Sequence, residues 1–195
     1  MNLDSFDKNL FLFINNFFGN VPFFDAFIKL IVNEYFIPVT LSLFLIYLWF
    51  AKGKSQQKNR VALPLAAFSL VIVNLVIALS NKYIIRERPF EQLDVHLLFY
   101  KPTDPSFPSN AVAVGFVLAT AVFLVNRKFG YFAIILAVLY AFARVYAGVH
   151  FPGDVLVGAL LGVLVTLAIF KYSKVLNKIT DRISKIQNNL RLDID

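Results

Sequence analysis

The sequence predicts an all-α protein, an integral membrane helical bundle of five to six spans with N-terminal helices that lie in the interface. Three observations support this fold class. Hydrophobic residues make up 58% of the 195 residues, and the mean hydropathy of +0.68 is too high for an ordinary soluble chain. Apolar runs recur along the chain, and aromatic or basic residues border them. A chain of this length fits a single domain, with a spanning core over 34–172.

The charge and the cysteine count exclude several functions. The net charge is +7, but the cations flank apolar runs, where the positive-inside rule explains them. Nucleic acid is therefore not an expected partner, and the lipid bilayer is. The sequence has no Cys, which rules out disulfides, a thiolate zinc site and a cysteine nucleophile.

The first element, residues 1–33, is rich in aromatic residues but is interrupted by Asn15, Gly19, Asn20 and Pro22. It leaves no clean run of the ~20 apolar residues that a span needs. We expect one or two helices lying in the interface, and the alternative is a poor sixth span.

Five apolar segments follow. The first ends in an aromatic belt, and the helix of the second is expected to continue through Lys82 toward Arg88, before Pro89 stops it. A tail rich in Lys and Asn, 173–195, is expected to be a solvated cytoplasmic helix. The predicted spans are 35–50, 61–79, 109–125, 129–147 and 154–170.

The basic loops predict the orientation of these spans. When five spans alternate, the loop 52–60, the turn 126–128 and the tail fall on one face, which should be cytoplasmic. The connection 81–108 and the loop 147–153 then share the opposite, extracytoplasmic face.

Three polar clusters meet on that shared face. The first holds Lys82, Arg86 and Arg88 just before Pro89, and several cations at one helix end can neutralise a phosphate. They could equally be anchors that reach lipid headgroups. The second is Pro-Ser-Phe-Pro-Ser-Asn at 105–110, where Ser109 is the expected N-cap of a long apolar helix, a potential anion site.

The third cluster combines Arg144, His150 and Asp154 around one short loop. We expect the Asp154 carboxylate to accept a hydrogen bond from one ring nitrogen of His150, which leaves the other as a nucleophile. Arg144 can reach the same space and bind phosphate bidentately. Ionisable groups at the rim of a membrane indicate a functional site.

The three clusters resemble, in order, the three signature motifs of the type 2 phosphatidic acid phosphatase family of membrane lipid phosphatases. That family has a Lys and an Arg-Pro, then Pro-Ser-x-His, then Arg-x5-His-x3-Asp. The third motif is complete at Arg144, His150 and Asp154, and the resemblance covers about 61–170.

The resemblance implies that His150 attacks phosphorus to form a phosphohistidine and that Asp154 holds its tautomer. It also implies neither cofactor nor metal, and an active site on the periplasmic face of a bacterial inner membrane. Polyprenyl diphosphate, phosphatidylglycerophosphate, phosphatidate and lipid A 1-phosphate all fit as the lipid phosphate substrate. The implied phosphate-binding residues are Lys82, Arg88, Ser109, Asn110 and Arg144, with Arg86 as a further candidate.

Two departures from the family pattern bear on activity. Five residues separate Lys82 from Arg88, where six are usual, so Arg86 could share the role of Lys82. Ala111 occupies the catalytic position where family members have the His that protonates the leaving group. Ala111 is then either a natural variant for which the protein compensates or a deliberate inactivating substitution. A protein that only binds or flips lipid phosphates would need the cations but not a His–Asp pair.

Overall fold

The computed structural model describes residues 3–51 and 56–192, and every regular element in these ranges is an α-helix. The predicted all-α class is confirmed. In chain order the helices are α1 (Leu3–Asn15), α2 (Pro22–Ile31), α3 (Phe36–Phe50), α4 (Gln56–Arg60), α5 (Ala62–Tyr83), α6 (Pro89–Gln92), α7 (Asn110–Val125), α8 (Arg127–Tyr146), α9 (Pro152–Phe170) and α10 (Ser173–Leu192).

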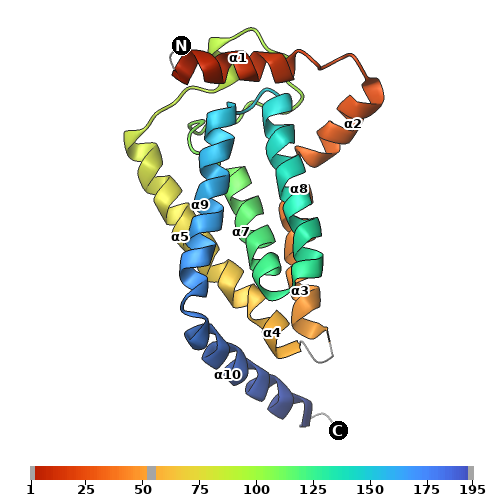
Figure 1. Ribbon diagram of the computed structural model, residues 1–195, viewed down its shortest axis with the longest axis vertical. Coiled ribbons are helices and arrows are strands. Elements are labelled where there is room, and N and C mark those ends of the chain that lie inside the picture. Colours follow the sequence, from red (N-terminus) through yellow and green to blue (C-terminus); the bar gives the residue numbers. More distant parts are fainter. Residues whose placement is uncertain (1–2, 52–55, 193–195) are drawn as a thin grey trace.

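The bundle is built around α7, which packs against α3, α5, α8 and α9. Figure 1 shows α7 in the middle of the bundle, α1 lying across one end and α10 extending beyond the other. The long connection between α5 and α7 and the short one between α8 and α9 both lie at the end covered by α1 (Figure 1).

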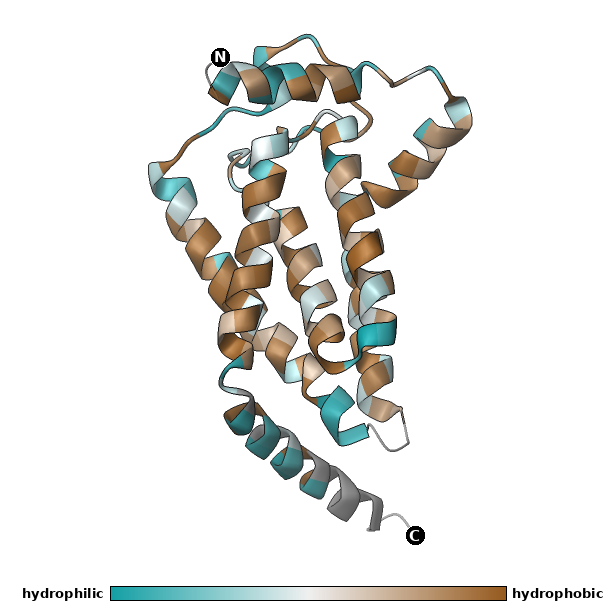
Figure 2. Ribbon diagram, viewed as in Figure 1, coloured by the Kyte–Doolittle hydropathy of each residue, from teal (hydrophilic) through white to brown (hydrophobic). Residues whose placement is uncertain are grey.

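The outer surface of the bundle is apolar. Side chains such as Leu43, Val71, Phe132 and Leu164 are 60–63% exposed although they lie in the middle of long helices. Figure 2 shows hydrophobic residues covering the bundle helices, with polar residues gathered at the two ends and along α10. Helices that are hydrophobic all round belong in lipid.

The predicted count of five to six spans is not confirmed. Three helical segments of the described chain are long and apolar enough to cross a membrane: Gln56–Tyr83, α8 and α9. A fourth span is formed if α2 and α3, which meet at 54°, are one broken span. α7 has 16 residues, a length of about 24 Å, shorter than the ~30 Å hydrocarbon core.

The prediction that the helix of the second span continues toward Arg88 is wrong. α5 ends at Tyr83, and Ile84 is extended with φ −120° and ψ 95°. Arg88 is extended too, because the ring of Pro89 disfavours the helical conformation in the residue before it. Lys82 and Arg86 therefore do not share one helical face.

Close packing of α9 on α7 places the start of α9. A Cβ atom on Gly158 would lie 2.5 Å from the carbonyl oxygen of Ser109, and one on Gly162 would lie 2.5 Å from that of Ala113. Glycines one turn apart thus let the two helices touch through their backbones. The Ser109 amide then donates to the Asp154 carbonyl at 3.1 Å, which joins the N-terminal ends of both helices.

Candidate active site

A cavity of about 270 Å³ brings residues of the three sequence clusters together. Its wall is formed by the start of α3, the first turns of α7, the C-terminal half of α8 and the connections that carry Arg88 and His150. The lining residues are Glu34, Tyr35, Pro38, Arg88, Asp104, Asn110, Ala111, Val114, Tyr140, Arg144 and His150.

His150 lies in the short connection between α8 and α9 and is almost completely buried. Its Nε2 atom is 3.2 Å from Nη1 of Arg88 and 3.4 Å from Nη2 of Arg144, while its Nδ1 atom is 3.0 Å from the carbonyl oxygen of Ser106. A guanidinium only donates and a carbonyl only accepts, so these partners assign the proton to Nδ1. Nε2 keeps its lone pair and faces the two cations.

The surroundings also keep this imidazole neutral. Burial lowers the pKa of His150 well below its usual value, and the positive charges of Arg144 and Arg88 lower it further. The hydrogen bond to Ser106 acts in the opposite direction but is outweighed. A neutral imidazole with a free Nε2 is the form that can attack phosphorus.

Asp154 holds a position different from the one expected from the sequence. Among the described contacts its carboxylate has no hydrogen bond to His150. It accepts from Arg86 Nη1 at 2.5 Å, from Ser106 Oγ at 2.5 Å and from the Phe151 amide at 3.1 Å. Ser106 lies between the two expected partners, because its Oγ is also 3.4 Å from Nδ1 of His150. Asp154 therefore reaches the imidazole through Ser106.

Arg88 is fixed by four contacts. Its Nη1 donates to the Val149 carbonyl oxygen at 2.9 Å and approaches His150, and its Nε and Nη2 donate to the carbonyl and carboxylate oxygens of Asp104, both at 2.9 Å. The side chain is 3% exposed. The extended segment before Pro89 thus places the buried guanidinium group of Arg88 in the wall of the cavity, where its hydrogen bonds hold it.

Arg144 supplies the second cation from the last turn of α8. Its guanidinium donates to the Val32 carbonyl at 3.3 Å, lies 3.7 Å from the Glu34 carboxylate and stands over the Phe99 ring. Its Nε atom has no partner among the described residues. Arg144 thus retains one donor that the described residues leave unpaired.

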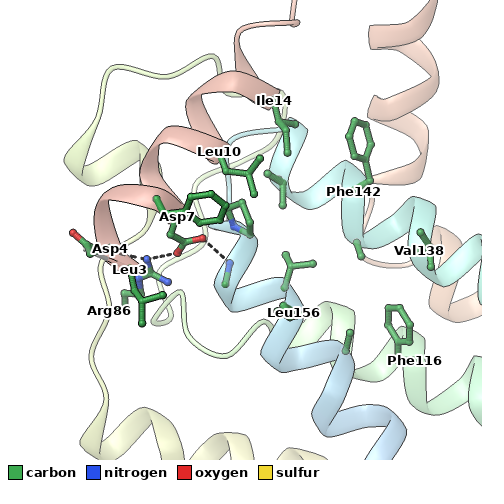
Figure 3. A pocket seen from close by; sticks show the side chains of 17 residues that line it. Leu3, Asp4, Asp7, Leu10, Ile14, Arg86, Phe116, Val138, Phe142 and Leu156 are labelled. Atoms are coloured by element: carbon green, nitrogen blue, oxygen red, sulfur yellow. Dashed lines mark hydrogen bonds and ion pairs between the residues drawn. The ribbon is translucent and has the colours of Figure 1, made fainter. Parts of the chain in front are cut away.

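Arg86 and Lys82 lie outside this cavity. Arg86 donates to Asp154 and, through Nη2, to Asp7 of α1 at 2.7 Å, an ion pair drawn in Figure 3. Burial alone would lower the pKa of Arg86, but its contacts with Asp7 and Asp154 raise it overall. Lys82 is exposed in the last turn of α5 and does not line the cavity. Neither residue lines the cavity that His150, Arg88 and Arg144 share.

The cavity beside Arg86 is larger but is lined mainly by apolar side chains. It measures about 740 Å³ and lies between α1, α8 and α9, with apolar side chains such as Leu10, Phe142 and Leu156 around it (Figure 3). His150, Arg88 and Arg144 do not line it. The candidate chemistry is therefore in the smaller cavity.

The second sequence cluster reaches the cavity only in part. Ser109 is the N-cap residue of α7, as predicted, but its buried hydroxyl has no partner among the described residues and does not line the cavity. Asn110 and Ala111, in the first turn of α7, do line it. The amide of Ser109 is already bonded to Asp154, so any anion binding would fall to the next amides of the helix.

Sequence reasoning missed four residues at the site. Ser106 belongs to the second cluster, but no role was assigned to it, and Asp104 lies directly before that cluster in the polar connection. Glu34 and Tyr140 lie in or next to apolar segments, where nothing in their spacing distinguishes them. All except Ser106 line the cavity.

Comparison with known proteins identifies the family. The sequence model of the family described as the PAP2 superfamily matches residues 62–178. The chain belongs to the PAP2 superfamily. This match confirms the expected family and its class of activity, the removal of phosphate from membrane lipids. The matched range contains Arg88, Ser106 and Arg144, the polar neighbours of the His150 imidazole in the described chain.

Two curated relatives and two solved structures show how far the similarity extends. The chain is 27% identical to the undecaprenyl-diphosphatase BcrC of Bacillus subtilis, over 82% of this chain and 80% of that protein. It is 34% identical to an undecaprenyl-diphosphatase of Sulfolobus acidocaldarius, over 80% and 73% of the two chains. Aquifex aeolicus LpxE matches with a TM-score of 0.67 and 29% identity, over 84% of this chain and 94% of its own. A phosphatidylglycerolphosphate phosphatase of Bacillus subtilis shares the fold, with a TM-score of 0.64, 22% identity and coverage of 88% and 86%.

Proposed function

We propose that this PAP2 phosphatase uses Nε2 of His150 as its nucleophile and forms a phosphohistidine intermediate. One observation carries the proposal: the lone pair of Nε2 lies between the guanidinium groups of Arg88 and Arg144, at 3.2 and 3.4 Å. A phosphate attracted to these two cations would bring its phosphorus to that lone pair.

The charges of the cavity support the chemistry. Attack by Nε2 spreads negative charge over the equatorial phosphate oxygens, and two fixed guanidinium groups stabilise that charge without reorganising. Asp104 and Glu34 neutralise the two cations in the free protein. An incoming phosphate would take over part of these contacts. Water then hydrolyses the phosphohistidine and regenerates the neutral imidazole.

The proposed substrate is a polyprenyl diphosphate. Support comes from the two relatives named as undecaprenyl-diphosphatases, which match at 27% and 34% identity. The apolar surface of the bundle fits a substrate whose tail stays in the bilayer while its phosphate enters the cavity. A lipid A 1-phosphate is the competing substrate, since the chain also resembles LpxE.

The proposed location is the bacterial inner membrane, with His150 at the extracytoplasmic face. Lys58, Arg60, Arg127 and Lys128 lie in α4 and at the start of α8, the end opposite α1 and the active site (Figure 1). The positive-inside rule puts these basic residues in the cytoplasm. A single cysteine at position 100 should then be labelled from outside intact cells and one at position 128 should not. The reverse pattern would overturn the orientation.

The catalytic proposal is tested by phosphate release from undecaprenyl diphosphate, lipid A 1-phosphate, phosphatidate and phosphatidylglycerophosphate in matched detergent micelles. We expect the highest kcat/KM with the diphosphate and complete loss in His150→Ala. The matched control is His96→Ala, which removes the other of the two His residues and should remain active. Phosphate release by His150→Ala at the parent rate would disprove the covalent mechanism.

A further inference from the structure

The phenol group of Tyr140 is an unused donor in the wall of the active-site cavity. Tyr140 is 1% exposed and lines the cavity together with His150, Arg144 and Ala111. Its hydroxyl oxygen is buried and has no hydrogen-bond partner among the described residues. A buried hydroxyl without a partner is unfavourable, so one in the wall of a binding cavity indicates a missing ligand.

The sequence holds Tyr140 in this place from two sides. It lies one helical turn before Arg144 on α8, so both side chains point to the same face of the helix. Across the interface, the ring packs on Gly115 of α7, where an added Cβ would be 3.3 Å from Cδ1 of Tyr140. Ala111, one turn before Gly115, contributes only a methyl group.

The other cavity residues are poorer proton donors. Asp104 and Glu34 are already engaged in ion pairs with Arg88 and Arg144. Tyr35 is 72% exposed at the rim of the cavity, and an amide such as Asn110 is not an acid. A guanidinium group is not a general acid in proteins. Among the described residues of the cavity, Tyr140 is the buried neutral O–H group.

We propose that Tyr140 is a further catalytic residue, the proton donor to the leaving group of the lipid phosphate. The inference rests on the proposed role of His150. Nε2 forms the N–P bond, the bond between phosphorus and the bridging oxygen breaks, and that oxygen takes the electron pair and the phenol proton. Water then attacks phosphorus and gives a proton to the phenolate as the N–P bond breaks, which restores both side chains.

The proposal predicts a dependence on the leaving group. A lipid monophosphate must release an alkoxide, a very basic group, whereas a lipid diphosphate releases the lipid monophosphate, which is stable as an anion. Help from an acid is worth more when the leaving group is more basic. Loss of the phenol should therefore harm monophosphate hydrolysis more than diphosphate hydrolysis.

The test compares Tyr140→Phe in two backgrounds, the parent chain and Ala111→His, with a mono- and a diphosphate of the same prenyl alcohol. In the parent chain we expect kcat for the monophosphate to fall by about 10²-fold and kcat for the diphosphate to fall clearly less. In the Ala111→His background the effect should shrink to within about threefold, because an imidazole then supplies the proton. Tyr131→Phe, on the exposed side of α8, is the matched control.

A structural role gives a different result. Equal losses with both substrates and in both backgrounds, or no loss beyond that of Tyr131→Phe, would overturn the proposal. If Tyr140→Phe is less stable, fluorotyrosine at position 140 keeps the shape of the ring and lowers the phenol pKa, so the alkaline limb of the pH–rate profile should move to lower pH. An unmoved limb would also overturn it. His150→Ala remains the separate test of the nucleophile.

Discussion

Ser106 contacts both Asp154 and His150. Its hydroxyl group donates to the carboxylate of Asp154 at 2.5 Å, and its backbone carbonyl oxygen lies 3.0 Å from Nδ1 of His150. One residue thus carries the contact between the carboxylate and the imidazole. Arg86 holds the other oxygen of the same carboxylate. Asp154 therefore positions the loop that orients His150, and the tautomer of His150 is set by a backbone carbonyl.

The first prediction concerns Ser106. Ser106→Ala should lower kcat by about tenfold with little change in KM, because the backbone carbonyl remains but loses its tie to Asp154. Ser106→Thr keeps a hydroxyl and should recover much of the rate. Since the two residues act as one unit, Ser106→Ala/Asp154→Asn should be no worse than the more damaged single variant. Additive losses in phosphate-release kinetics would show that they act separately.

The second prediction separates the cations. Arg88→Ala should reduce kcat/KM by about 10³-fold, since it removes charge that stabilises the transition state. Lys82→Ala should stay within about threefold of the parent, because Lys82 is exposed outside the cavity. Arg144→Lys should be strongly impaired, because a point charge cannot replace the planar fork of donors. A large loss of kcat/KM in Lys82→Ala would instead indicate that Lys82 binds the phosphate.

The third prediction concerns the protonation of His150. Its pKa is well below the usual value, so the imidazole should stay neutral, with the proton on Nδ1, as the pH falls through about 6.5. In His96→Ala the protein has one imidazole, whose ¹⁵N shifts report this directly. Inorganic phosphate should raise the pKa by offsetting the charges of Arg88 and Arg144. A free protein that titrates near 6.5 would contradict the burial of His150.

The same shift has a consequence for stability. In the unfolded chain His150 binds a proton below about pH 6.5, whereas in the folded protein it does not. Its contribution to the free energy of unfolding is therefore fully present above pH 6.5 and declines as the pH falls. Thermal unfolding in detergent should show this decline in the parent and less of it in His150→Ala.

The fourth prediction concerns the contact between α7 and α9. Gly158→Val should lower the free energy of unfolding by about 1–3 kcal/mol, because the Cβ atom of the new side chain would lie 2.5 Å from the Ser109 carbonyl oxygen. Activity should fall as well, since separating the helices moves Asp154. The control is Ala159→Val, whose side chain faces the 740 Å³ cavity and has room. Equal stability of both variants would contradict the close approach.

The sequence was sufficient to predict the helical class, the family and the convergence of Arg88, Arg144 and His150. These rest on hydropathy and on motif order, both of which are local properties of the chain. The partner of Asp154 could not be predicted, because a spacing of four residues suggested a direct bond to His150 while Ser106 arrives from 48 residues away. The positions of Lys82 and Arg86 depend on where α5 ends. That end is set by the extended conformation that Pro89 favours in the residue before it and also by tertiary contacts, which the local sequence does not reveal.

The contact of Asp7 with the start of α9 has a consequence for biosynthesis. Asp7 accepts from the Gly153 amide at 2.7 Å and from Arg86, although 146 residues separate Asp7 from Gly153. During translation, Asp7 leaves the ribosome long before the segment that carries His150 and Asp154. The carboxylate–guanidinium chain can close only after that late segment has entered the membrane and packed under α1. The contact between α1 and the start of α9 therefore forms late in synthesis, after most of the bundle helices are already in the membrane.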